Sequence, residues 1–257
     1  MRAVAAVLGL YLLYALVAVQ VYPDVLYPFD DTPHWMPELA PVAVEASAGP
    51  VHLVHAPGDG PLVLFFMGNT GALARHPSAL RAHLEAGRAL VALQYPGGGG
   101  LPGAPSEAGL KARALAAHDW AAARYGGPVV VHGYSLGSAL ALHVAARRDV
   151  AAVVLDAPFA RVCEQMTRAS LLPACWLPGV ERWDSLAEAG AVRAPVLIRQ
   201  GARDDLVLPE DSARLAEALR GAGVVVTREV LDGADHNDLF RHPRYRGGIA
   251  AFLAGLN

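Results

Sequence analysis

The chain has 257 residues, of which 54% are hydrophobic and 18% charged, so it can bury a sizeable core and fits one large α/β domain. Its net charge of -3 and scattered Arg residues leave no basic patch for a phosphate backbone, which argues against nucleic acid binding. Two cysteines, Cys163 and Cys175, are too few for a disulfide framework and lack the spacing with His of a zinc site. We therefore expect no metal and no other cofactor.

The first segment, Ala3 to Val21, carries no charge and is dominated by Ala, Val and Leu. Its length is close to the roughly 20 apolar residues that cross a bilayer as a helix, so residues 1–22 are predicted to anchor the chain. A cleaved signal peptide is the alternative, but its apolar region usually has about 7–15 residues and ends in a small-x-small site, which this stretch lacks after Ala5. A core helix is disfavoured because the segment is apolar on all sides.

The charges around this segment predict its orientation. Arg2 precedes it and Asp24, Asp30 and Asp31 follow it, and positive charge tends to stay in the cytoplasm. The catalytic domain is therefore expected outside the cytoplasm, in an oxidising compartment where Cys163 and Cys175 could pair. Abundant Ala and a single Lys are typical of a GC-rich bacterial gene, which favours a bacterial inner membrane.

Five prolines between residues 23 and 41 disfavour a helix there, so this stretch is interpreted as a linker to a domain at 42–257. Strand-like and helix-like patterns then alternate, which predicts a mostly parallel sheet covered by helices on both faces, with ligands at the carboxyl ends of its strands. The predicted strands are 42–45, 51–55, 62–67, 89–94, 129–133, 151–156, 195–200 and 224–230. The predicted helices are 78–86, 107–125, 136–147, 209–221 and about 245–256.

The strongest motif follows the apolar strand at 129–133. Residues 133–137 read GYSLG, a G-x-S-x-G match between a strand and an Ala-rich helix. In that context the motif marks a sharp turn that exposes a nucleophilic serine, and the pattern predicts an α/β-hydrolase fold with Ser135 as the nucleophile.

A serine hydroxyl needs a base and an orienting carboxylate, which follow it in the order acid, then His. Asp204 follows the strand at 195–200, and His236 follows the strand at 224–230, so both are expected beside Ser135. Asp205 competes directly with Asp204, and the strand-end residue Asp156 is a weaker competitor. His132 lies inside a strand before the nucleophile, and we interpret it as structural.

The oxyanion of an acyl-transfer reaction also needs donors. In this fold they are the amide after the nucleophile, here Leu136, and one from the loop after an earlier strand, for which Asn69 is the candidate.

Three segments carry a resemblance to a known group. Residues 65–71 read FFMGNTG, residues 95–99 read YPGGG, and residues 105–110 read PSEAGL. Together with the Ser, Asp and His loops, they resemble the membrane-anchored α/β-hydrolase domain proteins of the bud-emergence type, relatives of mammalian lysophospholipid and acyl-thioester hydrolases. Met67 stands where that group usually has His, and Pro96 where it usually has Arg. These departures concern the polar groups of the pocket and leave the three catalytic candidates intact.

Residues 157–190 lie between two strands, where this fold inserts a lid. The segment is apolar, and Phe159 and Trp176 in it, with Tyr134 beside the nucleophile, are predicted to bind substrate. An apolar lid beside a membrane anchor favours an acyl or lipid-like substrate, although the same side chains could simply pack on the domain.

The predicted function is hydrolysis of an ester or thioester through an acyl-enzyme on Ser135. A peptidase or amidase of the same fold, or a non-catalytic binding module, is the alternative. The ordered Ser, Asp and His set favours catalysis.

Overall fold

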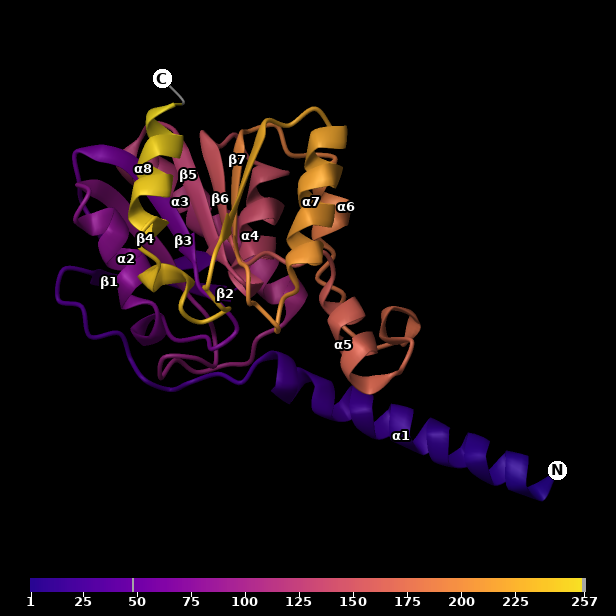
Figure 1. Ribbon diagram of the computed structural model, residues 1–257. Helices are drawn as coiled ribbons and strands as arrows, with labels where there is room; N and C mark the ends of the chain where they lie inside the picture. The colour runs from indigo at the N-terminus through magenta and orange to yellow at the C-terminus, as the bar shows by residue number, and fades with distance from the viewer. Residues whose placement is uncertain (48, 256–257) are drawn as a thin grey trace.

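The computed structural model describes residues 1–47 and 49–255, and its centre is an eight-stranded sheet (Figure 1). The strand order is β1-β2-β4-β3-β5-β6-β7-β8. Only the β1–β2 and β2–β4 pairs are antiparallel, and the other neighbours are parallel. The strands are β1 Ala40–Ala46, β2 Gly49–Ala56, β3 Gly60–Phe66, β4 Arg88–Gln94, β5 Val129–Tyr134, β6 Ala152–Asp156, β7 Val196–Gly201 and β8 Val226–Leu231.

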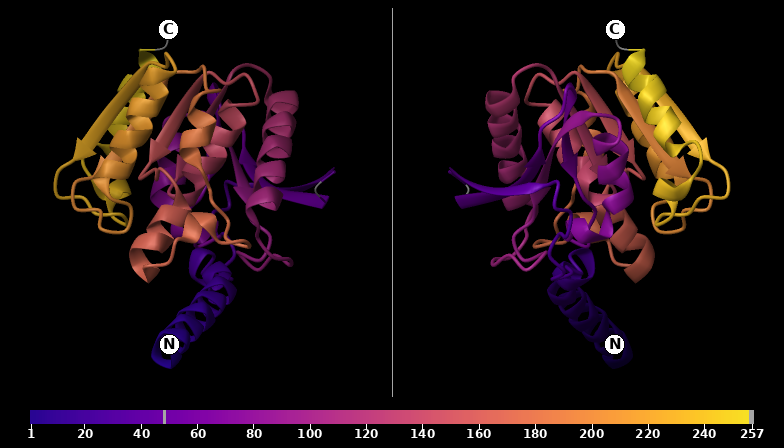
Figure 2. Two further views of the ribbon diagram at one scale, coloured as in Figure 1. Left: turned by 90° about the vertical axis from the view of Figure 1, so that its right-hand side faces the viewer. Right: turned by 90° about the vertical axis from the view of Figure 1, so that its left-hand side faces the viewer.

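Helices cover both faces of this sheet, as the alternating pattern predicted. Figures 1 and 2 show α2 and α8 on one face, and α3, α4, α6 and α7 on the other. Every position of β5, β6 and β7 is buried, which explains why each of these central strands begins with three or more consecutive apolar residues. The helices are α1 Arg2–Leu26, α2 Pro77–Leu84, α3 Glu107–Tyr125, α4 Leu136–Ala145, α5 Val162–Ser170, α6 Ser185–Ala189, α7 Pro209–Gly221 and α8 Tyr245–Ala254, with short 3-10 turns η1 Leu73–Arg75, η2 Ala174–Trp176 and η3 Leu239–Arg241.

The α/β-hydrolase architecture expected from the sequence is confirmed. The structure adds the lid helices α5 and α6, which were not predicted, and the other differences lie at the edges of elements. The first strand begins at Ala40 instead of residue 42, and the last strand runs over Val226–Leu231. The predicted final residue of the last helix, Leu256, and the last residue of the predicted domain, Asn257, lie outside the described residues.

The linker expected from residue 23 begins later, because α1 continues through Pro23 to Leu26. Proline inside a helix costs about 3 kcal/mol. The last turn nevertheless forms because Tyr22 and Leu26 on it are buried against the domain.

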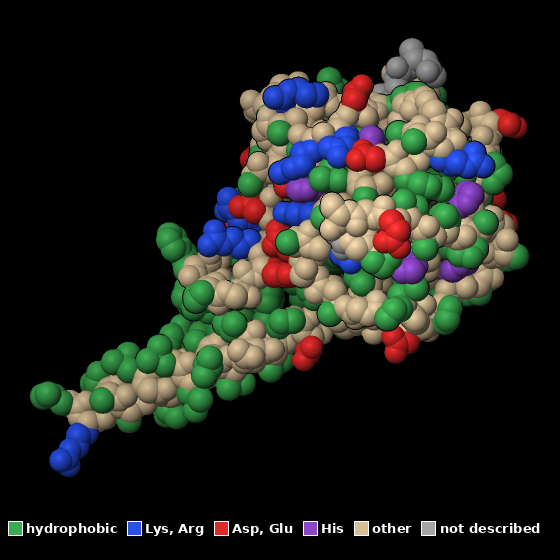
Figure 3. All heavy atoms as spheres, turned by 180° about the vertical axis from the view of Figure 1, so that it is seen from behind, with side chains coloured by type: hydrophobic (Ala, Val, Ile, Leu, Met, Phe, Trp, Pro, Cys, Tyr) green, Lys and Arg blue, Asp and Glu red, His purple; other side chains and the backbone are tan. Residues whose placement is uncertain are grey.

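Helix α1 projects from one end of the domain, beside α5 (Figures 1 and 2). Its most apolar window has a mean hydropathy of 2.3 and is not buried by the protein. At 1.5 Å per residue its 25 residues measure about 37 Å, more than the roughly 30 Å of a bilayer's hydrocarbon core. Figure 3 shows hydrophobic side chains along the whole projection. The helix is thus long and apolar enough to cross a membrane, as a signal sequence also would be.

Candidate active site

Ser135 occupies a sharp turn between β5 and α4. Its backbone has φ 51° and ψ -116°, a left-handed conformation that is uncommon for any residue with a side chain. The Ser135 N–H donates to the carbonyl of Asp156 at the end of the neighbouring strand, at 2.8 Å. Such strain persists only where the surroundings enforce it, and it is concentrated at functional sites.

The two glycines of the motif are required by close backbone approaches. A Cβ on Gly133 would lie 2.2 Å from the carbonyl oxygen of Gly137, and one on Gly137 would lie 2.1 Å from the carbonyl oxygen of Phe66. Neither contact is sterically possible, so α4 can start directly above β5 only with glycine at both positions.

The loops after β7 and β8 bring Asp204 and His236 to Ser135. His236 Nε2 lies 3.1 Å from Ser135 Oγ, and His236 Nδ1 lies 2.8 Å from Asp204 Oδ2. All three residues are buried, with 7%, 5% and 3% of Ser135, His236 and Asp204 exposed. This hydrogen-bond chain is the one by which an imidazole takes a serine proton while a carboxylate holds the imidazole in the productive tautomer.

The carboxylate of Asp204 is fixed on both of its oxygens. Oδ1 accepts from the amides of Leu206 and Val207 at 3.1 and 2.8 Å, and Oδ2 also accepts from the Gln200 side-chain amide at 2.9 Å. Its competitor Asp205 is exposed at the rim of the pocket and makes no hydrogen bond to His236 in the described part of the chain. Geometry therefore favours Asp204 over Asp205.

The weaker competitor, Asp156, belongs to a separate buried network under the nucleophile. Its carboxylate pairs with Arg199 at 2.6 Å and accepts from the Tyr245 hydroxyl at 2.7 Å. His132 Nε2 lies 2.8 Å from Asp156 Oδ2, while His132 Nδ1 lies 2.7 Å from His83 Nε2. His132 is thus held in the interior, where we expected a structural role for it.

Charge balance in this network favours an ionised Asp156. Burial raises the pKa of its carboxyl, but the charge of Arg199 and the contacts with His132 outweigh burial and hold the pKa below its ordinary value. For His83 and His132 burial dominates and lowers the pKa. The network therefore supports the turn that carries Ser135 as a buried ion pair flanked by neutral imidazoles.

The two predicted oxyanion donors lie beside Ser135. Leu136 is the first residue of α4, where helix amides lack intrahelical partners, and Asn69 lies in the loop after β3. Both line the same pocket as Ser135. The Asn69 side chain donates to the Leu26 carbonyl at 3.2 Å, which fixes this loop against the end of α1. Met67, which stands where the resembling group usually has His, is fully buried. Its carbonyl accepts from the Tyr95 hydroxyl at 2.7 Å.

A pocket of about 690 Å³ opens at Ser135. Its wall is mainly apolar and comes from α1, from Phe159 and α5 in the lid, from the loop after Asp204, and from Asn69 with Ser135 and Leu136. The lining residues are Tyr14, Ala18, Val21, Tyr22, Val25, Leu26, Asn69, Ser135, Leu136, Phe159, Val162, Gln165, Met166, Arg168, Ala169, Ser170, Asp205, Leu206, Val207 and Leu208. A pocket of this size and lining accommodates a small ligand with an apolar part.

Of the three predicted substrate-binding residues, only Phe159 lines this pocket. Tyr134 does not, because its ring packs on Phe240 and its hydroxyl donates to the His236 carbonyl at 2.8 Å. It supports the histidine loop instead. Trp176 lies outside the pocket too, with 86% of its surface exposed on the far side of the lid. The lid tryptophan that is buried is Trp183, whose indole donates to the Tyr27 hydroxyl at 3.0 Å.

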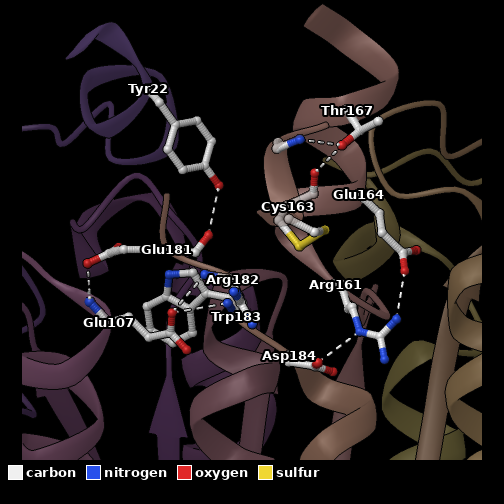
Figure 4. The surroundings of a disulfide bond; sticks show 12 residues. Tyr22, Glu107, Arg161, Cys163, Glu164, Thr167, Glu181, Arg182, Trp183 and Asp184 are labelled. Carbon is white, nitrogen blue, oxygen red and sulfur yellow. Dashed lines mark hydrogen bonds and ion pairs between the residues drawn. A yellow bond between two sulfur atoms is a disulfide. The ribbon is translucent and has the colours of Figure 1, made fainter. Parts of the chain in front are cut away.

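The lid is cross-linked to itself and to the rest of the molecule (Figure 4). Cys163 and Cys175 form a disulfide between α5 and η2. The Glu107 carboxylate accepts from the amides of Arg182 and Trp183 at 3.0 and 3.1 Å. Glu181 in turn accepts from the Glu107 amide at 2.7 Å. The PSEAGL segment thus fixes the base of the lid.

Sequence reasoning missed the contribution of α1 to the pocket. The lining residues of α1 follow a helical spacing of four, seven, eight, eleven and twelve residues after Tyr14, so they share one face of the helix. A signal in the sequence was the spacing of Tyr14 and Tyr22, which lie eight residues apart and so share one face of the helix.

The sheet order, the turn at Ser135 and the two strand-end loops define an α/β hydrolase. Residues 103–247, more than half of the chain, match the family model "Dienelactone hydrolase family", and the chain belongs to that family. A solved structure, the Pyrococcus furiosus esterase Pf2001, superposes with a TM-score of 0.74 at 18% identity, covering 89% of this chain and 98% of that one. At this identity the likeness shows the fold alone.

Two curated relatives are closer in sequence. An uncharacterized protein of Mycobacterium tuberculosis is 35% identical over 189 residues, which cover 70% of this chain and 64% of the relative. The lysophosphatidylserine lipase ABHD12 of Danio rerio is 27% identical over 222 residues, which cover 75% of this chain and 58% of the relative. The chain thus spans less than two thirds of the length of either relative.

Proposed function

We propose that this hydrolase is a membrane-anchored serine esterase that cleaves a carboxylic ester or thioester carrying an acyl chain. The observation that carries the proposal is the buried chain of contacts from Ser135 Oγ through His236 to Asp204, with Ser135 lining a mainly apolar pocket. A non-catalytic module has no need for a strained serine joined to a fixed imidazole.

The residues would divide the chemistry as follows. His236 Nε2 takes the proton of Ser135 as its Oγ bonds to the substrate carbonyl carbon, and the Leu136 and Asn69 amides bind the resulting oxyanion. The bond to the alcohol or thiol then breaks, and His236 returns the proton to that leaving group. Water, deprotonated by His236, next attacks the acyl-enzyme and releases the carboxylic acid and free Ser135. Asp204 orients the His236 ring and stabilises the imidazolium that forms.

We propose that α1 is retained as an anchor, with the domain outside the cytoplasm, in keeping with a bacterial inner membrane. Its last turns belong to the domain: Tyr22 and Leu26 are buried there, and the Tyr14 hydroxyl donates to the Ser170 carbonyl at 2.8 Å. Cleavage after an apolar signal would remove these contacts. The Cys163–Cys175 disulfide also fits an oxidising compartment.

The proposed substrate is a lipid-like ester with one acyl chain. The pocket has a mainly apolar wall, and the zebrafish relative is named for a lysophospholipid, a lipid with a single acyl chain. A peptide substrate fits less well, because an extended backbone needs a row of hydrogen-bonding partners, whereas this wall is mainly apolar.

The test is a kinetic comparison of the full-length protein with Ser135→Ala and His236→Ala on esters of graded acyl length. Each substitution is expected to lower turnover at least roughly a thousandfold while the melting temperature stays close to that of the wild type. Equal turnover in wild type and Ser135→Ala would exclude the proposed function.

A further inference from the structure

The pocket at Ser135 is a long channel between α1 and α5, walled on one side by the helix that is apolar enough to cross a membrane. From Leu26 to Tyr14, the lining residues of α1 extend over twelve positions, about 18 Å at 1.5 Å per residue. One leaflet of the roughly 30 Å hydrocarbon core is about 15 Å thick. The α1 wall is therefore about as long as one extended lipid chain.

The opposite wall is α5, and the α1 segment is fixed to the lid near the domain and to α5 itself at the far end. Near the domain, the Tyr22 hydroxyl donates to the carbonyl of Glu181, a lid residue after η2, at 3.4 Å (Figure 4). Tyr27, directly after α1, donates to the Glu181 carboxylate. At the far end, Tyr14 donates to the Ser170 carbonyl. The Cys163–Cys175 bridge holds α5 to the turn that follows it. The channel is therefore formed before any ligand binds.

The far end of the channel lies at the level of the apolar part of α1. Tyr14 lies ten residues, about 15 Å, before Asp24, the first charged residue after the apolar stretch. The lid residue that follows Ser170 is Leu171, which is 83% exposed, and Trp176 on the same lid is 86% exposed. Figures 1 and 2 also show α5 lying beside α1. Large apolar side chains exposed to water are costly, whereas at a membrane surface they are favoured.

We propose that the channel receives its substrate sideways from the bilayer: the acyl chain of a lipid in the adjacent leaflet enters between α1 and α5, and its ester bond reaches Ser135. Helix α1 is then both the anchor and one wall of the acyl site. The inference rests on the proposed function. It adds that the substrate is a lipid taken from the membrane and that α1 sets the length of acyl chain that the channel accepts.

Two α1 positions give a matched test. Ala18 is partly buried and lines the channel, so Ala18→Trp fills it. Leu16 is 61% exposed and, at about 100° per residue, faces nearly the opposite side of the helix, so Leu16→Trp places the same side chain outside the channel. Full-length proteins are placed in vesicles of dialkyl-ether phosphatidylcholine, which cannot be hydrolysed, with a fluorogenic palmitate ester or butyrate ester. Active sites are counted with a fluorophosphonate, so that rates refer to folded enzyme.

The ratio of palmitate to butyrate turnover is expected to fall at least about tenfold in Ala18→Trp and to stay within about twofold of the wild type in Leu16→Trp. Tenfold dilution of the palmitate ester with ether lipid, at constant bulk concentration, is expected to lower its turnover about tenfold. Equal ratios in the two variants, or a palmitate rate that follows bulk concentration, would overturn the inference. If the wild type hydrolysed neither ester, the proposed function itself would be overturned.

Discussion

The two lid tryptophans provide a sharp test of the packing, because sequence alone treats them alike. Trp183 is fully buried, and its indole nitrogen donates to Tyr27. Trp176 is 86% exposed, and no hydrogen bond of its side chain occurs among the described residues. Replacing a buried Trp by Ala typically costs about 3–5 kcal/mol, and the lost hydrogen bond adds about 1 kcal/mol. An exposed Trp away from any partner costs within about 0.5 kcal/mol.

For a domain of this size, 1 kcal/mol shifts the melting temperature by about 2–4 °C. Trp183→Ala should therefore melt roughly 8–24 °C below the wild type, and Trp176→Ala within about 2 °C of it. The assay is thermal unfolding of the full-length protein in detergent, followed by far-UV circular dichroism. Similar melting temperatures for the two variants would refute the account of the lid.

Three further predictions concern pH, the disulfide and the carboxylates. Burial and the nearby His236 lower the pKa of His76 from 6.5 to about 3, so only the unfolded chain takes up its proton between these values. The contribution of His76 to stability is therefore full above pH 6.5 and is lost as the pH falls below it. In urea titrations, His76→Phe should reduce the slope of unfolding free energy against pH by up to about 1.4 kcal/mol per pH unit. An unchanged slope in the variant would contradict this. Replacing Cys163 and Cys175 together by Ser opens a bridge across 12 positions and should cost about 3 kcal/mol, as measured by denaturant unfolding. Mass spectrometry that found both thiols free in native membranes would reject the bridge. Asp204→Asn should lower ester turnover less than His236→Ala but far more than Asp205→Asn, and the reverse order of the two Asp variants would reassign the acid.

The sequence predicted the parts of the molecule that follow local rules. Gly133 and Gly137 flank Ser135 at the only spacing that permits the turn, and parallel strands bring their carboxyl ends to one edge of the sheet. Asp204 and His236 could therefore be selected by their positions after strands β7 and β8. The fold class is confirmed, and the catalytic roles of these residues remain proposals.

The walls of the pocket could not be predicted in the same way. Hydropathy shows that α1 is apolar, but it does not tell which face packs on the protein and which faces lipid. The contact that closes the channel joins Tyr14 to Ser170, which lie 156 positions apart. In the lid, no helical or strand period distinguishes Trp176 from Trp183, so burial there depends on tertiary contacts such as that of Tyr27 with Trp183.

The measurement that most directly tests the central claim is covalent labelling of the full-length wild-type protein with a fluorophosphonate, followed by peptide mass spectrometry. A serine whose proton is taken by His236 reacts with this reagent, whereas an ordinary serine hydroxyl is a poor nucleophile. We expect one adduct per chain, located on Ser135, that is absent in Ser135→Ala and greatly slowed in His236→Ala. A folded wild-type protein that takes no label, or takes it at another residue, would contradict the assignment of Ser135 as the nucleophile.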